Sequence, residues 1–358
     1  MEVSVSRPVV ALPTGLAEIG TRVEQRIDAA LAVEVERWRA IAPELAAPLG
    51  ALRDLVAHGG KRLRPAFCYW AWVGAGGDPD DPVITDVAAA IELLHAFALV
   101  HDDVMDGSAV RRGEPTVHEA FAADHRARGA RGEARRFGEG AAILVGDFAF
   151  VYADRLMAAA PAQVLPLYDE LRIELCVGQY LDLLGSTNSG RDRGQAELIE
   201  RYKSGKYTVE RPLHIGAALA GRFDELGGPL SAFGVPLGEA FQMRDDLLGV
   251  FGDPAVTGKP VGDDLREGKL TPLVAAAVAM AGPDDQITLT RIGEPGLDAD
   301  GVAALQSVLV TTGAVAEVEQ AIALRVDAAL AALSSMPITE PARAALGDLA
   351  RFVAWRDR

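Results

Sequence analysis

The sequence predicts an all-α protein, a single large helical bundle around a central cavity, and three observations support this fold class. Hydrophobic residues make up 49% of the 358 residues, whereas aromatic residues make up only 6%. The apolar share is dominated by Ala, Leu and Val, and both Ala and Leu are strong helix formers. Apolar residues recur at helical spacing, with little strand pattern. We therefore expect one domain spanning 1–358.

The expected helices follow one another along the whole chain, after a loose N-terminal arm at 1–15. We expect helices at 16–45, 49–57, 65–73, 88–106, 141–159 and 165–184, then through Lys206 towards Ala220, at 230–250 and 270–281, and three amphipathic helices after residue 300. Connections are expected at 74–82, 185–195, 252–268 and 282–300. The Arg- and Gly-rich segment 124–140 predicts an exposed loop. Cys68 and Cys176 sit among apolar residues, which favours core packing for both thiols.

Charge and composition limit the partners that the chain can have. With 51 acidic and 35 basic side chains the formal charge is -16, which argues against a nucleic-acid-binding protein. Anionic small molecules stay open, because local cations and metals govern their binding. The first residues lack the apolar stretch of a signal peptide, and no uninterrupted apolar run approaches the roughly 20 residues of a membrane span. We predict a cytoplasmic protein with no transmembrane segment.

Two acidic motifs predict a metal site. Asp102, Asp103 and Asp106 directly follow an apolar run that predicts a long, mostly buried helix. On that helix Asp102 and Asp106 share one face, about 5–6 Å apart, where buried like charges need cations to neutralise them. Asp245 and Asp246 lie on a second helix far downstream. Because all-oxygen ligands suit Mg²⁺, which bridges to phosphates, we predict one polymetal site closed by both helices.

Basic residues lie apart from the acidic motifs. Lys61 and Arg64 follow the glycine pair of Gly-Gly-Lys-Arg-Leu-Arg-Pro, and Arg111 and Arg112 stand just beyond the first acidic motif. Arginine can grip a phosphate through two parallel hydrogen bonds, and glycine allows a close approach. Taken alone, the first basic segment is equally well explained as a surface turn. Together, the motifs predict metals that hold one diphosphate and bare cations that hold another.

These motifs resemble those of the trans-isoprenyl diphosphate synthase (polyprenyl synthetase) family. Five occur in the family's order: Gly-Gly-Lys-x-x-Arg-Pro at 59–65, Asp-Asp-x-x-Asp at 102–106, Arg-Arg-Gly at 111–113, Gly-Gln-x-x-Asp at 178–182 and Phe-Gln-x-x-Asp-Asp at 241–246. The resemblance implies an all-α bundle around a deep substrate tunnel, usually a homodimer. It also implies a prenyltransferase of isoprenoid biosynthesis that joins isopentenyl diphosphate to an allylic diphosphate, head to tail.

The resemblance also assigns roles to individual residues. The implied ligands of up to three Mg²⁺ ions on the allylic diphosphate are Asp102, Asp103, Asp106, Asp245 and Asp246. Isopentenyl diphosphate would be held by Lys61, Arg64, His95 and Arg112. The allylic diphosphate would be contacted by Arg111, Lys206, Gln242, Lys259 and Lys269. Dipoles of Gln242 and Thr208 would stabilise the allylic cation. Gln179 and Asp182 either brace the metal site or simply form hydrogen bonds inside the bundle.

The sequence departs from the family's pattern at two places. The second acidic motif usually reads Asp-Asp-x-x-Asp, but its last position here is Gly249. The family's adjacent Lys-Thr pair is interpreted here as Lys206 and Thr208, with Tyr207 between them.

Product length is predicted from the residues just before the first acidic motif, which form the tunnel floor in this family. Leu94, Phe97 and Ala98 are expected below the metal site, on the helix that carries the aspartates. One bulky ring beside a small residue suggests intermediate depth and geranylgeranyl diphosphate as product, with farnesyl diphosphate next. A class I terpene cyclase and a non-catalytic regulatory subunit are the alternatives. The first would not need a second diphosphate site, and the second commonly loses acidic motifs.

Overall fold

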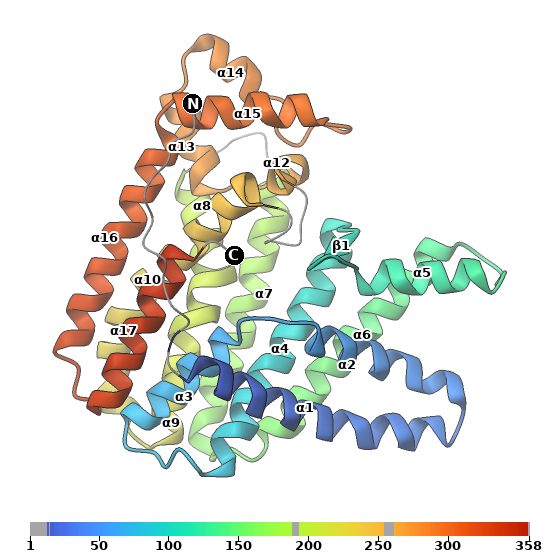
Figure 1. Cartoon of the computed structure of the whole chain (residues 1–358), viewed down its shortest axis with the longest axis vertical. Helices are drawn as coiled ribbons and strands as arrows, with labels where there is room; N and C mark the ends of the chain where they lie inside the picture. Colours follow the sequence, from blue (N-terminus) through green and yellow to red (C-terminus); the bar gives the residue numbers. More distant parts are fainter. Residues whose placement is uncertain (1–12, 14, 188–192, 254–260, 357–358) are drawn as a thin grey trace.

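The computed structural model describes residue 13 and residues 15–187, 193–253 and 261–356. Helices follow one another along nearly all of this length, which confirms the all-α class (Figure 1). In the first half they are α1 (Leu16–Arg39), η1 (Pro43–Ala46), α2 (Ala47–Ala57), α3 (Leu63–Gly74), α4 (Pro82–Asp106), α5 (Val117–Ala127), α6 (Ala134–Met157), η2 (Ala162–Val164) and α7 (Leu165–Thr187).

The second half of the described chain is equally helical. It contains α8 (Arg193–Ile199), η3 (Glu200–Glu210), α9 (Arg211–Leu219), α10 (Phe223–Phe251), α12 (Asp263–Glu267), α13 (Pro272–Met280), α14 (Pro283–Leu289), α15 (Ala299–Thr311), α16 (Ala314–Ser334) and α17 (Glu340–Trp355). The strands found among the described residues are β1 (Val110–Arg111) and β2 (Glu114–Pro115), which pair antiparallel just after α4. That the whole chain forms one domain remains a prediction of the sequence.

Helix α4 runs through the middle of the molecule and carries the first acidic motif at its C-terminal end. Asp81 caps its N-terminus by accepting a hydrogen bond from the Val83 amide at 2.9 Å, and Gly107 ends it with a φ of 66°. By length and composition α4 could cross a membrane, which the sequence analysis did not expect. It is instead packed against α1, α3 and α6, and 61% of its apolar window is buried inside the protein.

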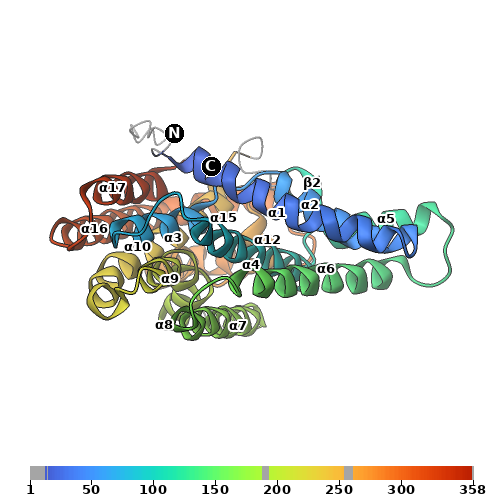
Figure 2. The same ribbon diagram turned by 90° about the horizontal axis from the view of Figure 1, so that it is seen from below.

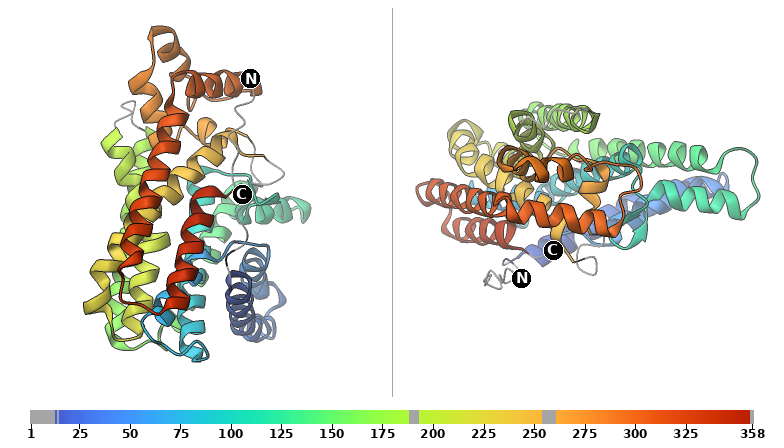
Figure 3. Two further views of the ribbon diagram at one scale, coloured as in Figure 1. Left: turned by 60° about the vertical axis from the view of Figure 1, so that its left-hand side comes forward. Right: turned by 90° about the horizontal axis from the view of Figure 1, so that it is seen from above.

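Helix α10, which carries the second acidic motif, joins two hydrophobic clusters. Leu230 and Phe233 pack into a large cluster with α1, α3, α4, α6 and α7. Met243 and Leu247, nearer the acidic motif, pack into a second cluster with α13, α15 and α16. Figure 3 shows α16 and α17 beside α10. The second motif is therefore held by a helix that is fixed along its whole length.

Segment η3 is a π-helix, a wide and rare form that is frequently found at functional sites. It packs closely on α10, because a Cβ atom on Gly238 would lie only 2.4 Å from the carbonyl oxygen of Gly205. Glycine at both positions thus allows the two backbones to touch. The contact holds η3 against α10 about two helical turns before the second acidic motif.

The structure corrects several sequence-based expectations. The predicted loop at 124–140 is largely helical, because α5 continues to Ala127 and α6 begins at Ala134. The expected helix at 16–45 ends at Arg39, and the segments at 252–268 and 282–300 contain the short helices α12 and α14. Cys68 is buried as predicted, whereas Cys176 is exposed on α7. The predicted N-terminal arm lies almost entirely outside the described residues.

Candidate active site

A cavity of about 780 Å³ lies between α1, α3, α4, α7, η3 and α10 and collects most of the predicted site residues. Those that line it are Lys61, Arg64, His95, Ala98, Asp102, Arg111, Arg112, Gln242, Asp245, Asp246 and Lys269. One group of lining residues consists of the aspartates Asp102, Asp182, Asp245 and Asp246, and another of the cations Lys61, Arg64 and Arg112. We call these the acidic end and the basic end.

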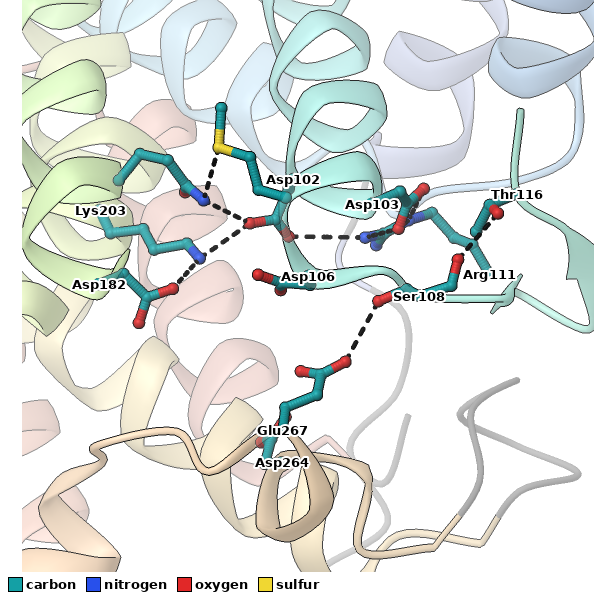
Figure 4. Close-up of polar contacts among 12 residues, drawn as sticks. Asp102, Asp103, Asp106, Ser108, Arg111, Thr116, Asp182, Lys203, Asp264 and Glu267 are labelled. Atoms are coloured by element: carbon teal, nitrogen blue, oxygen red, sulfur yellow. Dashed lines mark hydrogen bonds and ion pairs between the residues drawn. The ribbon is translucent and has the colours of Figure 1, made fainter. Parts of the chain in front are cut away.

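Three aspartates form a cluster at the acidic end, where Asp102 and Asp182 line the cavity and Asp106 lines a small adjoining cavity of about 130 Å³. Single carboxylate oxygens of Asp102, Asp106 and Asp182 all lie within 4.8 Å of one another. Lys203 of η3 stands between two of them, with its Nζ atom 2.9 Å from Asp102 and 2.5 Å from Asp182 (Figure 4). Gln179 donates a hydrogen bond to Asp102 at 3.0 Å. Three oxygen donors that close together fit a hard cation such as Mg²⁺.

The pKa values of Asp102 and Asp106 are shifted in opposite directions. Burial would raise the pKa of Asp102, but the nearby Lys203, Lys269 and Arg111 hold it well below its usual range. Burial and the neighbouring Asp102 raise the pKa of Asp106 to about 6. Its cationic neighbour, Lys269, lies 3.4 Å away. Without metal, lysine side chains therefore supply the positive charge that this cluster requires.

Asp103 faces away from this cluster. It is 2% exposed, does not line the cavity, and accepts hydrogen bonds from Nε and Nη2 of Arg111 at 2.9 and 2.6 Å. The reason is helical geometry, since positions i and i+4 share a face and i+1 does not. The structure therefore places Asp103 as the anchor of Arg111, away from Asp102 and Asp106.

The second motif completes the acidic end from α10. Asp245 and Asp246 both line the cavity. Arg356, which follows α17, forms an ion pair with Asp245. Gln242 donates a hydrogen bond to Asp246 at 2.7 Å, and burial together with Asp264 raises the pKa of Asp246. Arg356 was missed by the sequence analysis, because nothing local to its position indicates a contact with α10.

The basic end is built around a buried ion pair that the sequence analysis did not anticipate. Arg62 is 4% exposed and donates to Glu92 of α4 at 2.6 Å, with a second carboxylate, that of Glu24, at 2.9 Å. Its φ of 49°, like the 54° of Arg112, is unusual for a residue other than glycine. Such strained residues cluster at functional sites. The pair fixes the turn from which Lys61 enters the cavity.

The remaining groups of the basic end point into the cavity with unused polar atoms. Arg64 donates to Thr208 at 2.7 Å and lies 4.4 Å from the centre of the Tyr207 ring. Among the described residues, its Nε atom and Nδ1 of His95 have no hydrogen-bond partner. Burial, then Arg64 and Arg112, lower the pKa of His95. The site thus offers a neutral imidazole and several cations to an anionic group.

Comparison with known proteins decides the family. The Polyprenyl synthetase profile matches residues 48–308. The chain belongs to the polyprenyl synthetase family. It is 34% identical to the geranylfarnesyl diphosphate synthase of Aeropyrum pernix over 81% of this chain and 88% of that protein. It is 39% identical to a geranylgeranyl diphosphate synthase of Mycobacterium tuberculosis, over 61% of this chain and 58% of that one.

A solved structure agrees with this family. The geranylgeranyl pyrophosphate synthase of Corynebacterium glutamicum, complexed with isoprenyl diphosphate and magnesium, superposes with a TM-score of 0.91 at 35% identity. The match covers 96% of this chain and 99% of that chain. The protein is therefore a trans-prenyltransferase with the all-α isoprenoid synthase fold. The predicted family and enzyme class are confirmed.

The residues predicted as the family's lysine-hydroxyl pair, Lys206 and Thr208, do not line the cavity. Lys206 points away from the cavity, with its Nζ atom 2.6 Å from Glu174, and Thr208 is fully buried beneath Arg64. Lys203 and Ser204 line the cavity instead. They are adjacent in sequence, as the family's pair is. Lys203 and Lys206 face different ways because three residues along a π-helix turn a side chain to another face.

The predicted tunnel floor is only partly in place. Ala98 lines the cavity, together with Leu99. Phe97 packs against Phe150 of α6, with ring centres 5.0 Å apart, and does not line the cavity. Leu94 is fully buried and is likewise not among the lining residues. Lys259, predicted to contact the allylic diphosphate, lies outside the described residues.

Proposed function

We propose that the protein catalyses the Mg²⁺-dependent head-to-tail condensation of isopentenyl diphosphate with allylic diphosphates, with geranylgeranyl diphosphate as product. Farnesyl diphosphate is the second candidate. The observation that carries the proposal is one cavity lined both by Asp102 and Asp182 of the aspartate cluster and by the cations Lys61, Arg64 and Arg112. The reaction needs two such sites, because the allylic diphosphate leaves whereas the diphosphate of isopentenyl diphosphate stays on the product.

The acidic end would hold the allylic diphosphate. Asp102, Asp106 and Asp182 supply carboxylate oxygens from α4 and α7, and Asp245 adds one from α10. We propose up to three Mg²⁺ ions per site. When bound, these ions neutralise the leaving diphosphate so that the allylic C–O bond can ionise. Lys203 and Lys269, which pair with the aspartates, would turn to the phosphate oxygens.

The basic end would hold isopentenyl diphosphate without metal. Lys61, Arg64 and Arg112 provide the charge, and His95 a neutral hydrogen-bonding group. Arg111, fixed on Asp103, lies between the two ends and lines the cavity. The double bond of isopentenyl diphosphate would attack the allylic cation, and the departing diphosphate would accept the proton that is lost. Gln242 and Ser204 face the cavity and are the polar groups suited to stabilise the cation.

Two alternatives from the sequence are disfavoured by specific contacts. A terpene cyclase ionises a single diphosphate, which leaves the basic end without a purpose. A regulatory subunit that has lost catalysis would not need the cluster of Asp102, Asp106 and Asp182. The test is incubation of the purified chain with labelled isopentenyl diphosphate, each allylic starter and Mg²⁺, followed by chromatography of the dephosphorylated alcohols. A twenty-carbon alcohol supports the proposal, a fifteen-carbon alcohol keeps the reaction and changes the product, and no condensation contradicts it.

We also propose a homodimer that forms through α6 and α7. These helices lie along one outer edge of the molecule (Figure 2). Large apolar side chains on them are exposed: Ile143, Leu144, Val151, Ile173, Val177, Tyr180, Leu183 and Leu184. An apolar stripe of this kind is a protein–protein contact surface more often than a solvated one. Sedimentation at several concentrations would test the dimer. The cytoplasmic location stays a prediction.

A further inference from the structure

Gly249 stands where the second acidic motif of the family carries its third aspartate. It lies one helical turn after Asp245 on α10, and both positions line the cavity. A Cβ atom placed on Gly249 would lie 2.0 Å from Oδ2 of Asp264 and 2.6 Å from its Cγ atom. The space of the missing side chain is therefore taken by a carboxylate from α12.

The carboxylate of Asp264 is held there by the packing of its helix. The next residue, Leu265, is fully buried and its carbonyl oxygen accepts a hydrogen bond from the Gly293 amide at 2.9 Å. Arg266 donates to the carbonyl oxygens of Val261 and Leu297 at 2.6 and 3.3 Å. Both sides of this short helix are thus fixed, and Asp264 lines the cavity.

The surroundings of Asp264 indicate a place for a cation. Lys269 lies 3.6 Å from Asp264 and 3.4 Å from Asp106, so one ammonium group reaches carboxylates of both α12 and α4. Glu200 of η3, only 3% exposed, lines the same cavity near Asp246, and burial together with that carboxylate raises its pKa, so that a proton satisfies it rather than a cation beside Asp264.

We propose that Asp264 is a metal-binding residue that takes the place of the third carboxylate of the second motif, and that the absence of a side chain at Gly249 admits it. This inference rests on the proposed function and names a further residue of the same site. The second motif is then complete in space, with Asp245 from α10 and Asp264 from α12. It is incomplete only in the linear sequence.

The test measures metal binding rather than turnover. Mn²⁺ is titrated into the full-length protein with inorganic pyrophosphate, and bound Mn²⁺ is followed by electron paramagnetic resonance. We expect Asp264→Asn to weaken the affinity for Mn²⁺ by about tenfold or more. Its matched control, Asp263→Asn on the same helix, changes a residue that does not line the cavity and should bind within about twofold of the unchanged protein.

Two further variants test the role of Gly249. Gly249→Ala should displace the Asp264 carboxylate and weaken Mn²⁺ binding as Asp264→Asn does, although alanine favours a helix. The double variant Gly249→Asp/Asp264→Ala moves the carboxylate to α10 and should restore the affinity to within about threefold. The melting temperature without metal shows that each variant folds.

Three results would overturn the inference or the function beneath it. Unchanged Mn²⁺ binding in Asp264→Asn, or in Gly249→Ala, overturns the role of Asp264. If the double variant binds Mn²⁺ as weakly as Asp264→Asn does, a carboxylate at position 249 cannot replace the one at position 264. This result also overturns the proposed role of Asp264. If the unchanged protein itself binds no Mn²⁺ with pyrophosphate, the proposed function fails instead, so the two failures are distinct.

Discussion

The two ends of the cavity handle charge in opposite ways. At the basic end Arg62 is paired with the carboxylates of Glu92 and Glu24, and the turn that carries Lys61 is fixed without any ligand. At the acidic end Asp102, Asp106 and Asp182 face one another, and Lys203 and Lys269 stand among them. The difference is that the protein's own carboxylates fix the turn of the basic end, whereas at the acidic end lysine side chains occupy the places where metal ions would neutralise the aspartates.

The largest expected effect comes from breaking the acidic end. Asp102→Asn removes the carboxylate shared by the metal cluster and Lys203, and we expect kcat/KM to fall by about 10³-fold or more. The control is Asp147→Asn, at an exposed position of α6. Steady-state kinetics with saturating Mg²⁺ measure the effect. Activity within tenfold of the unchanged protein would contradict the assignment.

Breaking the buried pair of the basic end should destabilise the fold itself. Glu92→Ala leaves Arg62 buried without its closest carboxylate, 2.6 Å away, and removing one partner of such a pair costs about 3–5 kcal/mol. Urea unfolding without metal measures the free energy of unfolding. Glu119→Ala, on the more exposed helix α5, serves as control. A loss below about 1 kcal/mol would mean that the pair does not support the basic end.

Removing a cation that faces the cavity should separate the two substrates. Arg112→Ala deletes a charged hydrogen-bond donor worth about 1.5–3 kcal/mol, so KM for isopentenyl diphosphate should rise by about 10–100-fold. KM for the allylic diphosphate should change by less than about threefold. Initial rates with each substrate varied in turn decide between these outcomes. An equal rise in both KM values would contradict the assignment of one substrate to each end of the cavity.

Low pH should weaken metal binding at the acidic end. The pKa of Asp106 is raised to about 6 by burial and by Asp102, and a carboxyl group binds metal only after it loses its proton. Affinity for Mn²⁺ should therefore fall as the pH drops through 6, by at most about tenfold per pH unit. Asp106→Asn should flatten this dependence. Binding that stays constant between pH 5 and 7 would contradict the prediction.

The same pKa has the opposite consequence for the metal-free fold. Because the folded chain holds the Asp106 proton more tightly than the unfolded chain, this group adds stability below the unfolded pKa and loses it as the pH rises through 6. Melting temperatures measured from pH 4 to 8 without metal, with Asp106→Asn as comparison, test the sign.

The smallest expected effect is a change in product length caused by substituting an apolar residue that lines the cavity. Ala98→Phe places a ring in the cavity and should shorten the product by one isoprene unit, as chromatography of the alcohols would show. If Phe97 formed the tunnel floor, as the sequence suggested, Phe97→Ala would lengthen the product. Since Phe97 packs against Phe150 outside the cavity, its replacement should now change the product less than that of Ala98. A larger change in product length for Phe97→Ala than for Ala98→Phe would show that Phe97 forms the tunnel floor.

How far the sequence could predict the site depends on how local each signal is. Asp102 and Asp106 were predictable because one helical turn sets their distance. Asp182 was named through the family motif at 178–182, with a role at the metal site as one of two alternatives. Lys203 and Asp264 join the site from η3 and α12, and no local pattern indicates that these elements meet α4 or α10.

The fold shows the same limit. Apolar periodicity predicted the long helices, but the Arg-rich segment at 124–140 has few apolar residues and is nonetheless mostly helical. Its arginines are held instead by ion pairs one turn apart, as in the pairing of Arg128 with Asp124 and of Arg135 with Glu139.

The position of Cys176 has a practical consequence. Its thiol is exposed on α7, on the side that carries Ile173, Val177 and Tyr180, whereas Cys68 is fully buried. An alkylating reagent should therefore modify one thiol per folded chain. If two chains associate through α6 and α7, the interface would cover this thiol. Modification would then be faster at low protein concentration and slower at high protein concentration. The chain thus contains a natural chemical probe of its own association.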